Sequence, residues 1–145
     1  MANYNNYTYS TIISGTADND SIYNWGSNAT ISGGAGNDTL VAKEVSLLYP
    51  VNNVSMIGGT GNDIISLGSY VYNTKIKYNS GDGNDTVYGL KSNDTLQIYG
   101  SSYTTTRSGD DVIVNVGSGS ILVKNGFTNS FKRLYSQRKK VKLWL

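Results

Sequence analysis

Short runs that alternate polar and apolar residues recur along most of the chain. Asn28-Ala29-Thr30-Ile31, Asn53-Val54-Ser55-Met56 and Asn73-Thr74-Lys75-Ile76 each begin with asparagine and end with an apolar residue, and the first two place apolar side chains at every second position. This period predicts short β-strands with one buried face. Asparagine tolerates the left-handed conformation of turns, so these three asparagines are predicted to stack as equivalent turns at one edge of a sheet.

Each of these strands leads into a glycine-rich loop, and a second strand follows the loop. Gly33-Gly34-Ala35-Gly36-Asn37-Asp38-Thr39-Leu40 recurs as Gly58-Gly59-Thr60-Gly61-Asn62-Asp63-Ile64-Ile65. Ser80-Gly81-Asp82-Gly83-Asn84-Asp85-Thr86-Val87 lacks only the first glycine, and Gly15 to Ile22 is a degenerate copy in which Thr16 and Asp18 replace two glycines. The inward-facing residues predicted from both sets of strands are Ala29, Ile31, Val54, Met56, Ile76, Tyr78, Ile22, Leu40, Ile65 and Val87.

The loops combine the features that a hard cation requires. Glycine supplies positive φ and lets backbone carbonyls approach a shared point, while the aspartate adds a carboxylate. The loops resemble the hemolysin-type (RTX) calcium-binding repeat, G-G-x-G-x-D-x-U-x with U a large apolar residue. The resemblance covers residues 14–114 and implies an all-β fold, a right-handed parallel β-roll or β-helix solenoid.

The resemblance also implies the site residues. Asp20 and Asp38 are 18 residues apart, which in an RTX roll is one full turn, and the longer intervals to Asp63 and Asp85 require insertions at the opposite edge. About two to four calcium ions are expected between successive aspartate loops. The predicted ligand-bearing positions are Asp20, Gly33, Gly34, Gly36, Asp38, Gly58, Gly59, Gly61, Asp63, Gly81, Gly83 and Asp85.

The predicted domain organisation has four parts. Residues 1–13 form an N-terminal cap or flexible lead, 14–100 the repeats, 101–131 C-terminal capping strands and 132–145 a basic and apolar tail. Gly117 to Gly119 are predicted to turn a hairpin that closes the end of the solenoid. Asp94 falls on the edge opposite Asp85, where it either takes part in a further calcium site or caps a turn with its own side chain.

Charge is unevenly distributed. The net charge is +2, yet all ten acidic residues lie in 1–131, and six of the twelve basic residues lie in 132–145. Three interpretations of this tail stay open: a loosely packed end, a segment that contacts an anionic membrane or surface, and an uncleaved secretion signal of the RTX type. For the insertion with Leu47 and Leu48, packing on the roll is favoured over a partner surface. No nucleic acid partner is expected, and the sequence does not give the oligomeric state.

The composition disfavours catalysis and gives a first indication of location. Histidine and cysteine are absent, so the usual general base and thiol nucleophile are missing. The N-terminal residues lack the basic and apolar regions of a classical signal peptide. The expected function is a non-enzymatic, calcium-folded repeat domain, the C-terminal module of a secreted bacterial RTX-type protein. The alternatives are an adhesive solenoid that recognises glycan or ice, and a metal-free structural solenoid.

Overall fold

The computed structural model describes residues 1–129, 133–136 and 139–142. Two large sheets contain nearly all of the strands. The first has the order β1 (Asn3–Asn6), β3 (Ser21–Asn24), β5 (Thr39–Ala42), β8 (Ile64–Leu67), β11 (Asn84–Tyr88), β15 (Gly119–Val123), β14 (Asp111–Val116) and β13 (Tyr103–Ser108). The second has the order β17 (Lys139–Lys142), β16 (Arg133–Ser136), β12 (Thr95–Tyr99), β10 (Lys75–Asn79), β7 (Ser55–Thr60), β4 (Thr30–Ala35) and β2 (Ile12–Ser14). A short third sheet pairs β6 (Val51–Asn52) with β9 (Val71–Tyr72).

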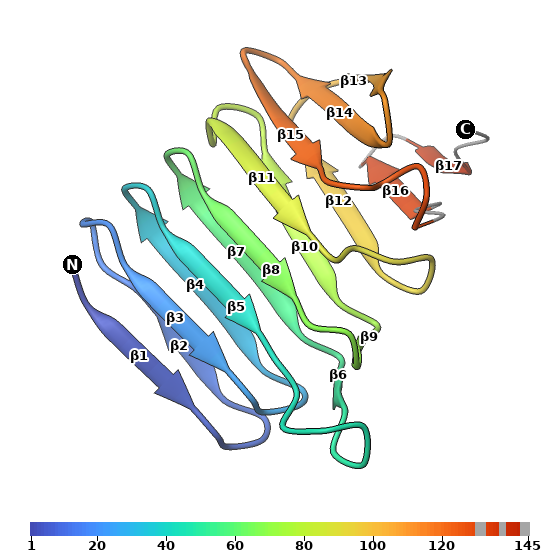
Figure 1. Cartoon of the computed structure of the whole chain (residues 1–145). Helices are drawn as coiled ribbons and strands as arrows, with labels where there is room; N and C mark the ends of the chain where they lie inside the picture. Colours follow the sequence, from blue (N-terminus) through green and yellow to red (C-terminus); the bar gives the residue numbers. More distant parts are fainter. Residues whose placement is uncertain (130–132, 137–138, 143–145) are drawn as a thin grey trace.

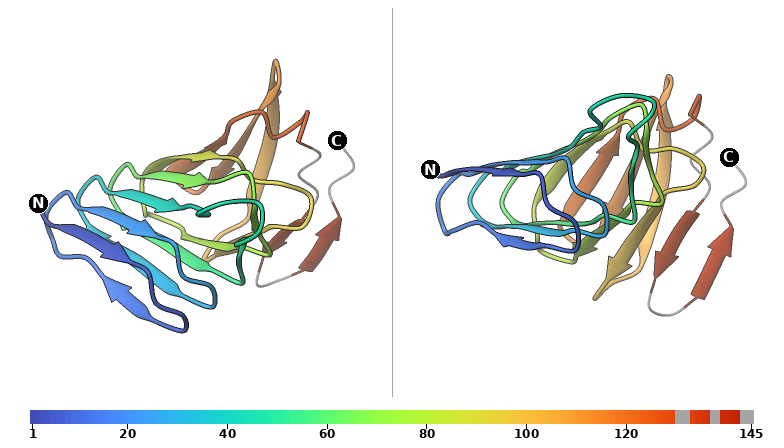
Figure 2. Two further views of the ribbon diagram at one scale, coloured as in Figure 1. Left: turned by 60° about the horizontal axis from the view of Figure 1, so that its bottom comes forward. Right: turned by 90° about the horizontal axis from the view of Figure 1, so that it is seen from below.

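The chain winds between the two large sheets, adding one strand to each per turn (Figure 1). Strands from successive turns pair in parallel, for example β5 with β8 and β4 with β7. Figure 2 shows these turns as open loops that join the two layers at both edges. The all-β fold and the parallel β-roll are therefore confirmed, and no helix among the described residues is long and apolar enough to cross a membrane.

The core lies between the sheets. All of the predicted inward residues are buried, with at most 2% of each side chain exposed. All of them except Ala29 join one hydrophobic cluster that continues into Val112, Val114 and Val116 of β14. The alternation of polar and apolar positions therefore located the core correctly, because a strand presents every second side chain to the same face.

One edge of the roll, here called the asparagine edge, is formed by the turns at Asn28, Asn53 and Asn73. These residues have φ of 57°, 58° and 57°, as the predicted stack of left-handed turns requires. The Asn53 side chain donates a hydrogen bond to Asn28 Oδ1 at 3.1 Å. The insertions at 43–50 and 68–70 also lie at this edge, between the strands that the repeats align.

Residues 3–14 are part of the roll. Strands β1 and β2 pair in parallel with β3 and β4 and so form a first turn within residues 3–14, where the sequence predicted a cap or lead. This turn has no glycine loop motif, and the backbone N–H of Ala2 instead donates to Asp20 Oδ1 at 2.5 Å.

The C-terminal hairpin forms as predicted. Strand β15 pairs in parallel with β11 and antiparallel with β14, so the Gly117–Gly119 turn changes the direction of the chain after the last repeat. Strand β16 pairs in parallel with β12, and β17 pairs antiparallel with β16. The rest of the predicted basic tail, at 132, 137–138 and 143–145, lies outside the described residues.

The predicted packing of Leu47 and Leu48 onto the roll is wrong. Their side chains are 63% and 82% exposed, because the 43–50 insertion turns outward at the asparagine edge. A compact turn, in which Tyr49 N–H donates to Ser46 O at 3.1 Å, directs both leucines away from the sheets.

Candidate metal centre

The four repeat aspartates form a ladder along the opposite edge, here called the glycine edge. The N–H of Asp20 donates to Asp38 Oδ1 at 2.7 Å, and the N–H of Asp38 donates to Asp63 Oδ1 at 2.7 Å. The N–H of Asp63 continues the ladder to Asp85 Oδ1 at 3.0 Å. At most 6% of any of the four residues is exposed. One carboxylate oxygen of each aspartate is therefore used to hold adjacent turns in register.

A parallel ladder of asparagine side chains runs beside the aspartates. Asn37 N–H donates to Asn19 Oδ1, Asn62 N–H to Asn37 Oδ1, and Asn84 N–H to Asn62 Oδ1, each at 2.8 Å. The Ser120 hydroxyl bonds to Asn84 Oδ1 at 3.0 Å and ends the row. Both residues of the recurring Asn-Asp pair thus link successive turns, and only the aspartate was predicted from the sequence as a functional residue.

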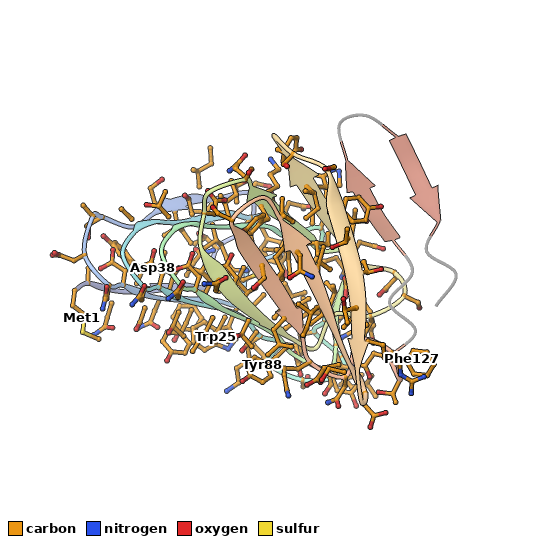
Figure 3. The ribbon with its side chains drawn as sticks, turned by 90° about the horizontal axis from the view of Figure 1, so that it is seen from above. Met1, Trp25, Asp38, Tyr88 and Phe127 are labelled. Atoms are coloured by element: carbon orange, nitrogen blue, oxygen red, sulfur yellow. The ribbon has the colours of Figure 1, made fainter. Side chains whose placement is uncertain are left out.

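The second oxygen of two aspartates is left free. Within the described part of the chain, Asp38 Oδ2 and Asp63 Oδ2 are buried and have no hydrogen-bond partner. Figure 3 labels Asp38, which lies on the inner side of the loops that join the two sheets. Burying a carboxylate oxygen without a partner costs free energy. The arrangement is therefore more favourable with a cation bound at these oxygens than without one.

The first glycine of each motif keeps space open at these oxygens. A Cβ atom on Gly33 would collide with Asp38 Oδ2 and would lie 2.5 Å from the carbonyl oxygen of Gly58 in the next turn. A Cβ on Gly58 would likewise collide with Asp63 Oδ2. A carboxylate oxygen and a carbonyl oxygen thus converge beside a glycine, which is the donor set that calcium prefers.

The other motif glycines bring successive loops into close contact. Gly34, Gly36, Gly59, Gly61 and Gly83 have positive φ, from 99° to 133°. Gly59 lies against the backbone of Gly34, Gly61 against Gly36, and Gly83 against Gly61. Side chains at these positions would separate the turns and break the aspartate ladder.

The pKa values of the aspartates differ along the ladder. Burial raises the pKa of Asp63 to about 6 and that of Asp85 to about 7, and the neighbouring carboxylates add to both increases. Burial also raises the pKa of Asp38. Since the charged forms are disfavoured, a cation that binds these carboxylates would relieve an unfavourable environment.

Asp20 differs from the other aspartates because Thr16 satisfies it. The Thr16 N–H and hydroxyl bond to Asp20 Oδ2 at 2.6 and 2.8 Å. The hydrogen bond from the Thr16 N–H lowers the pKa of Asp20. The sequence shows that Thr16 replaces a motif glycine. As a result, the Asp20 carboxylate already has hydrogen-bond partners within the protein.

The third repeat departs from the predicted alignment. Strand β10 pairs with β7 through Lys77 opposite Ile57, so Tyr78 stands where the other repeats have their first glycine. The Tyr78 hydroxyl donates to the Gly83 carbonyl at 2.6 Å. Gly81, aligned in the sequence with Gly59, lies in a lengthened loop, and a Cβ there would meet no described atom within 4 Å. Gly83 and Asp85 remain in the stack.

A signal for Tyr78 was present in the sequence. Gly33 and Gly58 follow Asn28 and Asn53 at the same interval that separates Tyr78 from Asn73. Alignment from the asparagine turn would have identified Tyr78, whereas alignment from Asp85 hid it.

On the asparagine edge, Asp94 is fully buried and accepts hydrogen bonds from Thr74 N–H and Lys91 N–H at 2.8 and 2.9 Å. Asp94 therefore caps turns.

Carboxylates alone cannot surround a cation at the glycine edge. Among the described residues, no three acidic, histidine or cysteine side chains come together in a metal-binding group. Backbone carbonyls such as that of Gly58 would have to supply the remaining ligands, which the glycine-lined loops allow.

Comparisons with known proteins agree with this geometry. A family model described as the RTX calcium-binding nonapeptide repeat matches four copies, at residues 8–40, 53–69 and 79–97. Among solved structures, the extracellular lipase LipA from Serratia marcescens is similar, with a TM-score of 0.62 and 24% sequence identity. The similarity covers 77% of this chain and 18% of the lipase. No curated protein sequence matches the chain. The chain therefore contains RTX calcium-binding nonapeptide repeats, and these repeats fold as a parallel β-roll.

Proposed function

We propose that this chain is a non-enzymatic domain whose folding is driven by two calcium ions, one held at Asp38 and one at Asp63. The observation that carries the proposal is the pair of buried Oδ2 atoms that have no partner among the described residues. No calcium ion is assigned to Asp20, because its carboxylate already accepts two hydrogen bonds from Thr16. Tyr78 occupies the glycine position of the third repeat, so no further ion is assigned beside Asp85.

The residues explain why folding would depend on the ion. Stacking the turns buries Asp38, Asp63 and Asp85 next to one another, and ordering the glycine loops costs conformational entropy. Calcium supplies positive charge and accepts carboxylate and carbonyl oxygens as ligands. Because the carboxylates are brought together only in the folded roll, the free energy of calcium binding adds to the free energy of folding.

We further propose that the domain acts outside the cell, as the C-terminal module of a larger protein. The similar lipase is extracellular, and this chain spans 18% of its length. Millimolar external calcium would fold the roll, whereas low calcium inside the cell would leave it unfolded for export.

Far-UV circular dichroism of EDTA-treated protein, titrated with calcium and separately with magnesium, tests the proposal. We expect the β signal to rise with calcium, to saturate at or below millimolar concentration and to respond much less to magnesium. The double variant Asp38→Asn, Asp63→Asn should lose this response, while the exposed control Asp110→Asn should keep it.

A metal-free structural solenoid is the second candidate, and the bonds between Thr16 and Asp20 favour it. They show that one turn of this roll satisfies its carboxylate without a cation. A complete β spectrum in EDTA that does not change with calcium would support this candidate and contradict ion-driven folding.

A further inference from the structure

The 43–50 insertion carries a group of exposed apolar side chains that the calcium sites do not explain. Val45, Leu47, Leu48 and Tyr49 are 71%, 63%, 82% and 67% exposed. The insertion projects from the asparagine edge, away from the glycine loops (Figures 1 and 2). Exposed apolar side chains that are grouped at one point mark an interaction site more often than singly scattered ones do.

The insertion is held in a defined shape. Ser46 and Tyr49 form a β-bridge, and the Lys43 N–H donates to Asn24 O at 2.9 Å. Leu47 and Leu48 occupy the two central positions of this turn, so they project together from its tip. A preformed tip loses little conformational entropy when it binds.

The charges around the tip are arranged for a negative partner. Within the described residues, two acidic side chains lie in the asparagine-edge loops between 43 and 94, Glu44 and Asp94, and the hairpin turn farther along this edge holds Asp110 and Asp111. Glu44 turns inward against Gly68, where its Oε2 atom is buried, and Asp94 is fully buried. Lys43 is exposed, and the Lys91 ammonium lies above the Tyr72 ring, 5.5 Å from its centre. Between residues 43 and 94 this edge therefore presents apolar groups and basic groups while its carboxylates face inward. At the hairpin turn, Asp110 is exposed and Asp111 is paired with Lys124.

We propose that the 43–50 insertion docks the roll onto an anionic lipid membrane, with Leu47 and Leu48 entering the bilayer interface. A membrane accepts a narrow apolar tip without shape complementarity, and Tyr49 suits the boundary between the apolar region and the headgroups. Lys43 and Lys91 would lie near lipid phosphates. A second copy of the chain fits less well, because stable protein interfaces use about 20–30 residues on each side and the tip has four.

The absence of cysteine from the sequence permits a site-specific test. Leu48→Cys, labelled with an environment-sensitive fluorophore, is mixed in calcium with phosphatidylcholine vesicles that contain phosphatidylglycerol. We expect a blue shift and a several-fold increase in emission. Ile12→Cys is the matched control, because Ile12 is 78% exposed but lies on β2 in the first turn of the roll, outside the insertion, and its label should not respond.

Unlabelled variants measure the contribution of each group to vesicle partitioning. Leu47→Ser with Leu48→Ser should weaken partitioning about tenfold or more, since each leucine loses its burial in the membrane. Lys43→Gln should weaken it about fivefold on anionic vesicles and have little effect on pure phosphatidylcholine. Circular dichroism in calcium verifies that each variant is folded.

Three outcomes would overturn the proposal. The first is vesicle binding without a response at position 48, which would place the contact elsewhere in the chain. The second is no binding to either type of vesicle. The third is a response at position 48 that depends on protein concentration and not on vesicles, which would identify a second copy as the partner.

Discussion

The same residue of the repeat has different partners in successive turns. Asp20 Oδ2 accepts two hydrogen bonds from Thr16, whereas Asp38 Oδ2 has no partner in the described chain. We expect Asp38→Asn to weaken calcium binding at least tenfold, because the variant keeps an acceptor for the Asp20 N–H but removes the charge that binds the cation. Isothermal titration calorimetry measures this effect.

The matched variant is Asp20→Asn, which removes a carboxylate from the same ladder. It should leave the number of bound ions and their affinity unchanged, although it weakens the hydrogen bonds from Thr16 and slightly destabilises the fold. Equal losses of calcium affinity in the two variants would contradict the assignment of the sites.

The raised pKa values of Asp63 and Asp85 predict a pH dependence for the metal-free protein. Their pKa values of about 6 and about 7 lie above the ordinary value of 3.8, so the folded roll binds more protons than the unfolded chain between these limits. Stability in EDTA should therefore fall as the pH rises from about 4 to about 7. Thermal melts at about pH 5 and about pH 8 should give the lower Tm at the higher pH.

Calcium should reverse this order, since it binds the deprotonated carboxylates and competes with protons. In calcium, Tm should be higher at about pH 8 than at about pH 5. The double variant Asp63→Asn, Asp85→Asn should weaken both trends, because Asp38 alone on the ladder then keeps a raised pKa and a proposed calcium site. A metal-free protein that becomes more stable as the pH rises would mean that these carboxylates are charged in the roll and need no cation.

At the scale of strands and loops, the glycines differ in what they contribute. Gly58→Ala places a methyl group where Asp63 Oδ2 lies, so we expect loss of one calcium ion and a destabilised roll. Gly81→Ala places its methyl group in open space among the described atoms, and its cost is the strain of an alanine at φ 101°, about 1–2 kcal/mol. The calcium stoichiometry of each variant, compared with its stability in urea, separates the two effects.

The elements that the sequence predicted are those with a strong local pattern. Asn28, Asn53 and Asn73 identified one edge because a left-handed turn favours asparagine, and the glycine loops identified the other. The first turn, β1 and β2, was missed because its pairing with β3 and β4 depends on tertiary contacts and not on a motif. The exposure of Leu48 was missed because hydrophobicity alone does not show whether a side chain packs locally or projects.

The candidate site was predictable to the level of the repeat but not to the level of single atoms. The motif identified the aspartates, yet which oxygens are satisfied depends on Thr16 and on the register between turns. Tyr78 displaced one predicted loop because two alignments, from the asparagine turn and from the aspartate, differ in the third repeat. The two alignments differ because the loop of the third repeat is longer, and the sequence motif does not determine the length of the loop.

For the whole molecule, the distribution of free carboxylate oxygens predicts where calcium stabilises the fold most. Asp38 and Asp63 lie in the middle of the roll, in the turns that β4, β5, β7 and β8 form. The C-terminal hairpin has its own support, since β14 and β15 pair antiparallel and bury Val114, Val116 and Ile121. In a solenoid, each turn depends mainly on its neighbours, so removal of an ion need not unfold distant turns equally.

We therefore expect hydrogen exchange in EDTA to accelerate most in residues 30–67 and least in residues 111–123. Calcium should restore protection in 30–67 over the same concentration range in which the circular dichroism signal rises, because both report formation of the same turns. Partial protection of the hairpin in EDTA would identify it as the part of the roll on which the calcium-dependent turns assemble. Equal acceleration across 3–123 would show instead that the roll folds as one cooperative unit, in which the two aspartate sites stabilise every turn together.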